Sequence, residues 1–366
     1  MNRLWWAQIR AVIRLEFKKT LFARRGLWIY VLAALPVLLY IAFAFAVGNR
    51  QHQSERIAQR GEKQLTYQDL TSVKTGMKKE EVIALLGKPP VADHWKEERP
   101  VDGGSNVTVA REDYHYSDGR SDLNLGIADG KVESINLSSN INLGQDSVIF
   151  AGVFQFFFLR LAIFFGCLGI FMNLFRGEVL DRSLHFYFLA PIRRDVLMLG
   201  KFLAGLLATC TIFLTSEILQ TIAYLWHYTA AEQDLYLYHN HGLEYAAIYA
   251  GVTLLACLRY GSFFLVAGML FRNPIAPAAF ALIWEGINPF LPAVLKQFSI
   301  IYYLKSLCPV EIPVAPGTSP LFALLISNSD PISAPVAITG ILVVSVIALY
   351  ISSLQVRRME VNYTTE

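Results

Sequence analysis

The chain has 366 residues, of which 54% are hydrophobic and 17% are charged, and its mean hydropathy is +0.40. Soluble proteins carry about 25% charged residues, so the composition excludes an ordinary soluble protein and indicates a polytopic α-helical membrane protein. The net charge of +3 is too small and too scattered to indicate a nucleic-acid partner.

The first segment, residues 1–26, has the pattern of an amphipathic helix that lies in a membrane interface. Apolar residues recur at helical spacing on one face, and basic residues occupy another; these are Trp5, Ile9, Val12, Ile13, Phe17 and Leu21, and Arg3, Arg10, Arg14 and Lys18. Such a helix binds anionic lipid headgroups through its basic face. We expect a cytoplasmic elbow helix that leads into the first membrane span; a generic positively charged anchor is the alternative.

Six segments are apolar and long enough to cross a bilayer, which takes about 20 residues. We predict spans over residues 27–47, 147–175, 197–226, 244–271, 275–304 and 335–356, the fifth broken by prolines. Lys and Arg concentrate before the first span, between the second and third, and after the sixth. By the positive-inside rule, both termini and the tail 357–366 are expected in the cytoplasm, and residues 305–334 form an outer loop.

Residues 48–146 contain no long apolar run and are predicted to form a small α+β domain on the outer side, inserted between the first two spans. A capped helix is indicated over Thr75–Gly87. Alternating segments near 112–116, 121–127 and 131–137 are separated by turn sequences that contain Asp-Gly, as in hairpins. We expect a long loop over residues 88–110.

Residues 76–89 of this domain read Gly-Met-x-x-x-x-Val-x-x-Leu-Leu-Gly-x-Pro. With the strands that follow, residues 66–138 resemble the SmpA/OmlA (BamE-like) fold. The resemblance implies a helix pair packed on a small antiparallel sheet in the periplasm. Members of that family are usually lipoproteins, and no lipobox Cys precedes this domain, so only fold and compartment are carried over. A passive insertion and a module that gates substrate or docks a periplasmic protein both stay open.

The segment between the second and third spans, residues 176–196, is short, charged and amphipathic. It combines an acidic residue, a polar turn, a Leu-rich helix, a small residue before Pro, basic residues and a closing Gly-Lys. The residues in this pattern are Glu178, Asp181, Arg182, Leu184, Leu189, Ala190, Pro191, Arg193, Arg194, Gly200 and Lys201. In this loop and in its six-span layout, the chain resembles the permeases of type-2 ABC exporters.

That resemblance implies that the loop is a coupling helix that docks into a separate ATPase subunit. The implied coupling residues are Glu178, Asp181, Arg182, Leu184, Pro191, Arg193 and Arg194; an ordinary cytoplasmic loop is the alternative. The resemblance further implies a re-entrant end to the fifth span, a second permease chain in a homodimer or heterodimer, and the bacterial inner membrane. The sequence has no G-x-x-x-x-G-K-[ST] motif, so ATP and Mg²⁺ are expected in the partner, and the chain is not expected to be an enzyme.

Four charged residues fall inside the predicted spans: Arg160, Glu217, Arg259 and Glu285. Such residues are costly in a membrane and usually face the bundle interior with a partner. At a rise of about 1.5 Å per residue, similar depths predict two pairs, Arg160 with Glu217 and Arg259 with Glu285. Structural pairing and a place in a substrate pathway are both open.

We therefore expect the membrane subunit of an ATP-driven exporter that moves an unidentified substrate outward. The alternative is an ATPase-coupled scaffold or sensor that acts through its periplasmic domain without transport. A secondary transporter is disfavoured because no repeated half is visible, and an intramembrane enzyme because no cluster of catalytic residue types is found. The four cysteines have no metal-ligand or disulfide spacing, so no metal site is expected.

Overall fold

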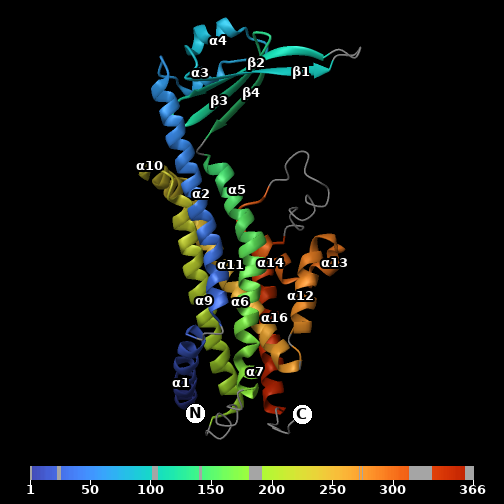
Figure 1. Ribbon diagram of the computed structural model, residues 1–366. Coiled ribbons are helices and arrows are strands. Elements are labelled where there is room, and N and C mark those ends of the chain that lie inside the picture. Colours follow the sequence, from blue (N-terminus) through green and yellow to red (C-terminus); the bar gives the residue numbers. More distant parts are fainter. Residues whose placement is uncertain are drawn as a thin grey trace. The chain divides into compact units, whose positions relative to one another are not determined.

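The structure, a computed structural model, describes residues 2–22, 26–100, 106–139, 142–180, 192–271, 273, 275–312 and 332–358 (Figure 1). The chain divides into two compact units. One is a helical unit of Met1–Tyr40, Gln145–Leu225 and Ala230–Glu366, and the other is an α+β unit of Ile41–Gly144 with Trp226–Thr229. Of the expected outer loop, residues 313–331 lie outside the described residues, as do residues 359–366 of the expected tail.

Five helices within the described residues are long and apolar enough to cross a membrane. They are α2 (Leu27–Arg60), the continuous helix Leu143–Phe175, α9 (Arg194–Leu225), α11 (Gly242–Leu270) and α16 (Ala334–Arg358). They are consistent with a polytopic helical membrane protein, and they lie where five of the predicted spans are expected. Helix α2 continues well beyond residue 47, because no residue before Gly61 interrupts its polar end.

The predicted fifth span, residues 275–304, is a set of short elements. These are α12 (Ile275–Ile287), the 3₁₀ turn η4 (Asn288–Phe290), α13 (Ala293–Lys296) and α14 (Ile300–Ser306). Pro289 and Pro292 carry no backbone N–H and so break the helical ladder. Helix α12 has 13 residues, and at about 1.5 Å per residue it is shorter than the hydrocarbon core of about 30 Å. The predicted interruption is confirmed, but the described chain has five helices of spanning length rather than six.

The second spanning helix changes its winding along its length. It comprises α5 (Leu143–Val153), the π-helix η2 (Phe154–Ile163) and α6 (Phe164–Phe171), and α7 (Asn173–Leu180) follows. A π-helix of ten residues is unusual, since π-helical turns mostly occur singly and often at functional sites. The extra residue per turn rotates the side chains that follow relative to a regular α-helix.

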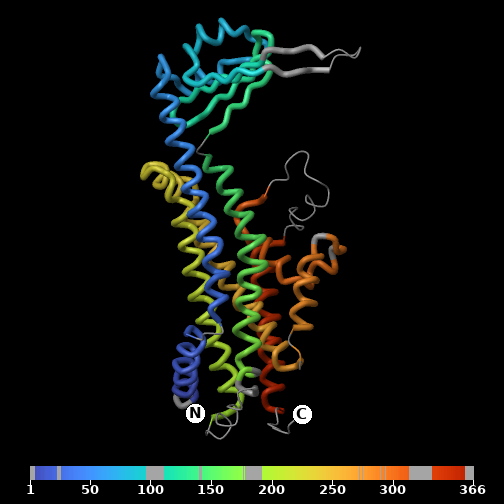
Figure 2. The backbone as a smooth tube through the Cα atoms, viewed as in Figure 1, coloured from blue at the N-terminus to red at the C-terminus, as the bar shows by residue number. Residues whose placement is uncertain are grey.

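The helical unit is a bundle in which α1 (Asn2–Leu21) packs on α9, α9 packs on α11, and α11 packs on α16 (Figure 2). Its centre is aromatic, with Phe158, Phe164, Phe213 and Phe264 buried. Gly261 of α11 allows a close approach, because a Cβ atom there would lie 2.6 Å from the ring of Phe171. Two short elements, α10 (Ala230–Asp234) and η3 (Leu235–His239), precede α11.

The α+β unit packs two short helices on an antiparallel sheet. The helices are α3 (Tyr67–Thr71) and α4 (Lys79–Leu86), and the strands, in spatial order, are β1 (Val91–Pro100), β2 (Asn106–Ser117), β3 (Ser121–Ala128) and β4 (Lys131–Ser139). The hydrophobic core joins Leu70 and Val82 of the helices to Leu123, Leu125 and Val132 of the sheet. The predicted α+β class and the three predicted strand segments are confirmed.

The prediction of a long loop over residues 88–110 is wrong. Strand β1 pairs along its whole length with β2, from Val91 opposite His115 to Pro100 opposite Asn106. Asp93, His94 and Trp95 are exposed, so residues 91–95, the part of β1 whose side chains are described, have no buried face. The sequence therefore lacks the apolar alternation by which a strand is recognised.

A polar network connects α4 to the sheet. The Glu112 carboxylate accepts hydrogen bonds from Lys79 Nζ and from the Tyr114 hydroxyl, both at 2.6 Å. These two donors hold the pKa of Glu112 below its ordinary value of 4.5. The contact with Glu112 likewise raises the pKa of Lys79. Residues far apart in sequence are thus joined by a charge-assisted contact.

Replacing Leu125 by Ala should destabilise the α+β unit, because its fully buried side chain would leave a cavity in the core. A loss of about 2–5 kcal/mol is expected for such a change. Hydrogen exchange measured by mass spectrometry on the full chain should show lower protection over residues 106–139. Leu85→Ala is the matched control, because Leu85 is 37% exposed; equal effects of the two substitutions would contradict the assigned core.

The Glu112 network should also make this unit sensitive to acid. Because the folded-state pKa is lowered from 4.5, the carboxylate contributes stability above about pH 4.5, and that contribution is lost as the pH falls through the folded-state pKa. Glu112→Gln should lower protection at neutral pH and flatten its change below pH 4.5. Exchange protection factors between pH 3 and pH 7, corrected for intrinsic rates, check this; an unchanged profile would exclude the assignment.

Candidate functional site

Most of the predicted coupling residues fall at the edge of what the structure describes. Asp181, Arg182, Leu184 and Pro191, with Leu189 and Ala190, lie outside the described residues. Glu178 is placed on the backbone of α7, and its side chain is not described. Arg193 and Arg194 are described, at the start of α9. The site can therefore be built from the two helix ends that flank residues 181–191.

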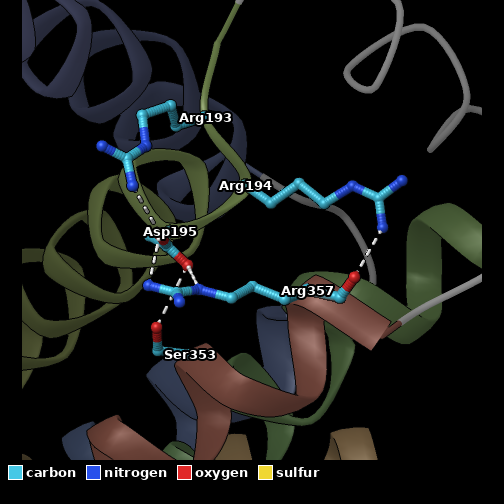
Figure 3. Close-up of polar contacts among 5 residues, drawn as sticks. All are labelled: Arg193, Arg194, Asp195, Ser353 and Arg357. Atoms are coloured by element: carbon cyan, nitrogen blue, oxygen red, sulfur yellow. Dashed lines mark hydrogen bonds and ion pairs between the residues drawn. The ribbon is translucent and has the colours of Figure 1, made fainter.

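A carboxylate that sequence analysis did not single out, Asp195, organises the start of α9 (Figure 3). Arg357, at the end of α16, donates to both carboxylate oxygens, with Nε at 2.7 Å and the second nitrogen at 2.8 Å. Ser353 Oγ donates to the same carboxylate at 3.1 Å, and Arg193 lies 3.7 Å away. A bidentate arginine–carboxylate pair fixes orientation as well as distance. The first turn of α9 is thereby tied to the last turn of α16.

The two predicted coupling arginines take part in this arrangement in different ways. Arg194 donates to the backbone carbonyl of Arg357 at 3.0 Å, which adds a second link between α9 and α16. Arg193 lies over the ring of Trp5 of α1, with its guanidinium carbon 4.9 Å from the ring centroid. Such a cation–π contact contributes about 0.5–1 kcal/mol at an exposed site. Arg193 and Arg194 thus connect the start of α9 to two different helices.

The strongest tie is a buried ion pair between Glu16 of α1 and Lys201 of α9. Lys201 Nζ donates to Glu16 Oε1 at 2.8 Å, and the two side chains are 0% and 3% exposed. Lys201 also donates to the carbonyl of Leu174 at 3.4 Å and lies 5.6 Å from the centroid of the Phe175 ring. One ammonium group therefore joins α1, the beginning of α7 and α9.

The residue before this lysine explains how α1 comes so close. A Cβ atom on Gly200 would lie 2.8 Å from Val12 Cγ1 and 2.9 Å from Val12 Cβ. Val12 and Ile9 of α1 are buried, together with Glu16. The closing Gly-Lys of the loop pattern thus has a local physical role: the glycine admits α1, and the lysine pairs with it. The buried face of α1 is turned to α9.

The predicted pairing of the intramembrane charges is not found. In the described part of the chain, no ion pair joins Arg160 to Glu217, although Glu217 is buried in α9. Glu285 instead accepts hydrogen bonds from Ser299 Oγ at 2.5 Å and from the backbone N–H groups of Ile300 and Ile301 at 2.7 and 3.0 Å. Its carboxylate thus serves the first turn of α14 rather than a direct ion pair with Arg259.

No protein-family model matches this chain, and no curated protein matches it either. The function proposed below therefore rests on the geometry of the helical unit and on the sequence resemblances.

The Glu16–Lys201 pair should behave as a unit. Lys201→Met leaves the buried carboxylate without the Lys201 ammonium, and Glu16→Gln leaves the ammonium without its carboxylate; each should cost about 3–5 kcal/mol. The double variant Glu16→Leu/Lys201→Met should recover most of that loss, because no unbalanced charge stays buried. Thermal unfolding of the full chain in neutral detergent measures the four members of the cycle.

The exposed pair at the start of α9 provides the matched control. Arg357 and Asp195 are 56% and 24% exposed, so Arg357→Gln should cost only about 0.2–1 kcal/mol. Additive losses in the double variant of Glu16 and Lys201 would show that the two residues do not interact.

Proposed function

We propose that this chain is the membrane subunit of an ATP-driven exporter, and that residues 176–196 couple it to a separate ATPase. The observation that carries the proposal is that both ends of this segment are linked to neighbouring helices. Lys201 links α9 to the beginning of α7 and to α1, and Asp195 links α9 to α16. A segment that receives force from a partner moves the spans only if its ends are fixed to them.

The chemistry of the segment supports a docking role. Between Glu178 and Arg194 it presents acidic, basic and large apolar residues within a stretch too short to form its own core. An ordinary connection between two spans needs neither several large apolar residues nor a network of contacts at its ends. Because no phosphate-binding loop occurs in the sequence, the proposal places ATP and Mg²⁺ in the partner.

The rest of the chain is assigned within the same proposal. We place both termini in the cytoplasm of a bacterium and the α+β unit, with its BamE-like sequence pattern, in the periplasm. A second permease chain, identical or related, completes the pathway. Exposed apolar residues along α16, among them Leu342, Val346 and Tyr350, support contact with lipid or with that second chain. A substrate moves outward by alternation between two arrangements of the spans.

Purification in a gentle detergent, with mass spectrometry of the associated proteins, tests the proposal first. A stoichiometric soluble ATPase is the expected result. A chain that purifies alone, or with proteins bound only through residues 48–146, would favour the scaffold or sensor function instead.

The charge swap Asp181→Lys/Arg182→Glu should then abolish stimulation of that ATPase, so that its rate falls to the value of the ATPase alone. The expected cause is the reversed charge pattern at the docking surface, which repels the partner. The matched control is Arg120→Glu/Asp234→Lys, which makes the same two charge changes at exposed residues expected on the outer side. Full stimulation by the Asp181/Arg182 variant would overturn the coupling assignment.

A further inference from the structure

Three cationic side chains gather inside the helical unit on three elements that contact one another. Arg160 lies on η2, Arg259 on α11 and Lys305 on α14, and each of these elements contacts the other two. Arg160 and Lys305 lie against the same ring, Phe156, at 5.6 and 5.2 Å from its centroid. All three cations are half-buried, so they are shielded from bulk solvent but not sealed inside the core.

The carboxylate nearest to these cations does not balance their charge. Glu285 is close enough to Arg160 and to Arg259 to interact electrostatically. Its oxygens, however, accept the three hydrogen bonds from Ser299, Ile300 and Ile301. Among the described residues, Arg160 and Arg259 lie near this single carboxylate, and Lys305 adds a third positive charge close to Arg160. Unbalanced charge in a membrane interior is unfavourable by several kcal/mol.

Two buried polar atoms in the same place have no partner among the described residues. They are the hydroxyl of Tyr260, a residue that is 1% exposed, and Nε of Arg160. A buried donor with no acceptor is costly, and native structures contain few of them. Arg160 also lies in the π-helix η2, a winding that recurs at functional sites. Charge, unused donors and helix geometry converge on one location.

We propose that Arg160, Arg259 and Lys305, with the hydroxyl of Tyr260, bind an anionic phosphate or carboxylate group within the helical unit. This deepens the proposed function, on which it rests, by assigning the exported substrate to the class of anionic molecules. A guanidinium offers parallel N–H donors that match phosphate or carboxylate oxygens, and the lysine adds a point charge. The bound group supplies the missing negative charge and the acceptors for both unused donors.

The same chemistry is found on an anionic lipid headgroup and on a free anion, so the test uses both. The purified full chain in neutral detergent is titrated with dioleoylphosphatidylglycerol or with the neutral dioleoylphosphatidylcholine. In parallel it is titrated with inorganic phosphate at constant ionic strength. Thermal unfolding gives apparent affinities, and native mass spectrometry counts retained lipid. Stabilisation by phosphatidylglycerol alone identifies a lipid headgroup, and stabilisation by phosphate identifies a free anion.

Arg160→Gln should weaken the apparent affinity about tenfold, the loss expected for one charge-assisted hydrogen bond. Tyr260→Phe, which keeps the ring and all charges, should weaken it about fivefold. Lys296→Gln is the matched control, because it removes a cation from α13 that is not part of the cluster; its affinity should equal that of the unmodified chain.

The anion-free protein provides a second readout. If the cations are unbalanced, Arg160→Gln should be at least as stable as the unmodified chain in anion-free detergent, because it removes buried excess charge. A clear loss of stability would show that Arg160 is paired within the protein and would overturn the proposal. An affinity of Tyr260→Phe equal to the unmodified value would also overturn it. Equal stabilisation by both lipids, with none by phosphate, would also overturn the proposal.

Neither ATP nor an ATPase enters these measurements. Loss of anion binding would therefore overturn this inference and leave ATPase coupling untouched. Absence of an ATPase partner would overturn the exporter and leave the anion site standing.

Discussion

The helical unit depends on the buried ion pair between Glu16 and Lys201. A charge pair without exposure to water is retained only where its geometry is good and its remaining donors are used. Lys201 meets that condition, since its ammonium also reaches the Leu174 carbonyl and the Phe175 ring. The pair sets the position of α1 on α9 and of both on the beginning of α7. Residues 181–191 therefore connect α7 to α9, two helices that Lys201 links to each other.

The sequence predicts those parts of this arrangement whose signals lie within a short stretch of residues. Apolar windows predict the long helices because about 20 residues suffice to mark a span. The Asp-Gly turns predict the strands β2 to β4, since Gly119 and Gly130 take the positive φ angles of 90° and 73° that such turns need. Glu16 carries no such signal. It precedes Phe17 on an amphipathic helix, and its partner lies 185 residues away.

The intramembrane charges show that depth along a helix does not by itself predict which side chains pair. Depth fixes one coordinate of a side chain, whereas pairing also needs the rotation of each helix about its axis. Arg160 lies in a π-helix, so a rotation counted with the regular α-helical repeat is wrong for it. Glu285 belongs to a short helix that ends before Pro289. Its carboxylate accepts hydrogen bonds from the free backbone N–H groups at the start of α14. Hydropathy predicts neither the rotation of Arg160 about its helix axis nor the hydrogen bonds of Glu285.

The two buried polar centres of the helical unit differ in one respect that bears on function. At Lys201, the cation meets the carboxylate of Glu16 in a direct contact of 2.8 Å. At Arg160, the described residues place Arg259 and Lys305 on contacting elements beside one carboxylate, Glu285, which is hydrogen-bonded to Ser299, and they offer no acceptor for two donors. A centre that only held helices together would gain nothing from excess charge, because a neutral polar pair or an apolar pair would serve as well. Excess charge is useful where a counter-charge arrives and leaves, so this imbalance is the physical basis for assigning a ligand of opposite sign.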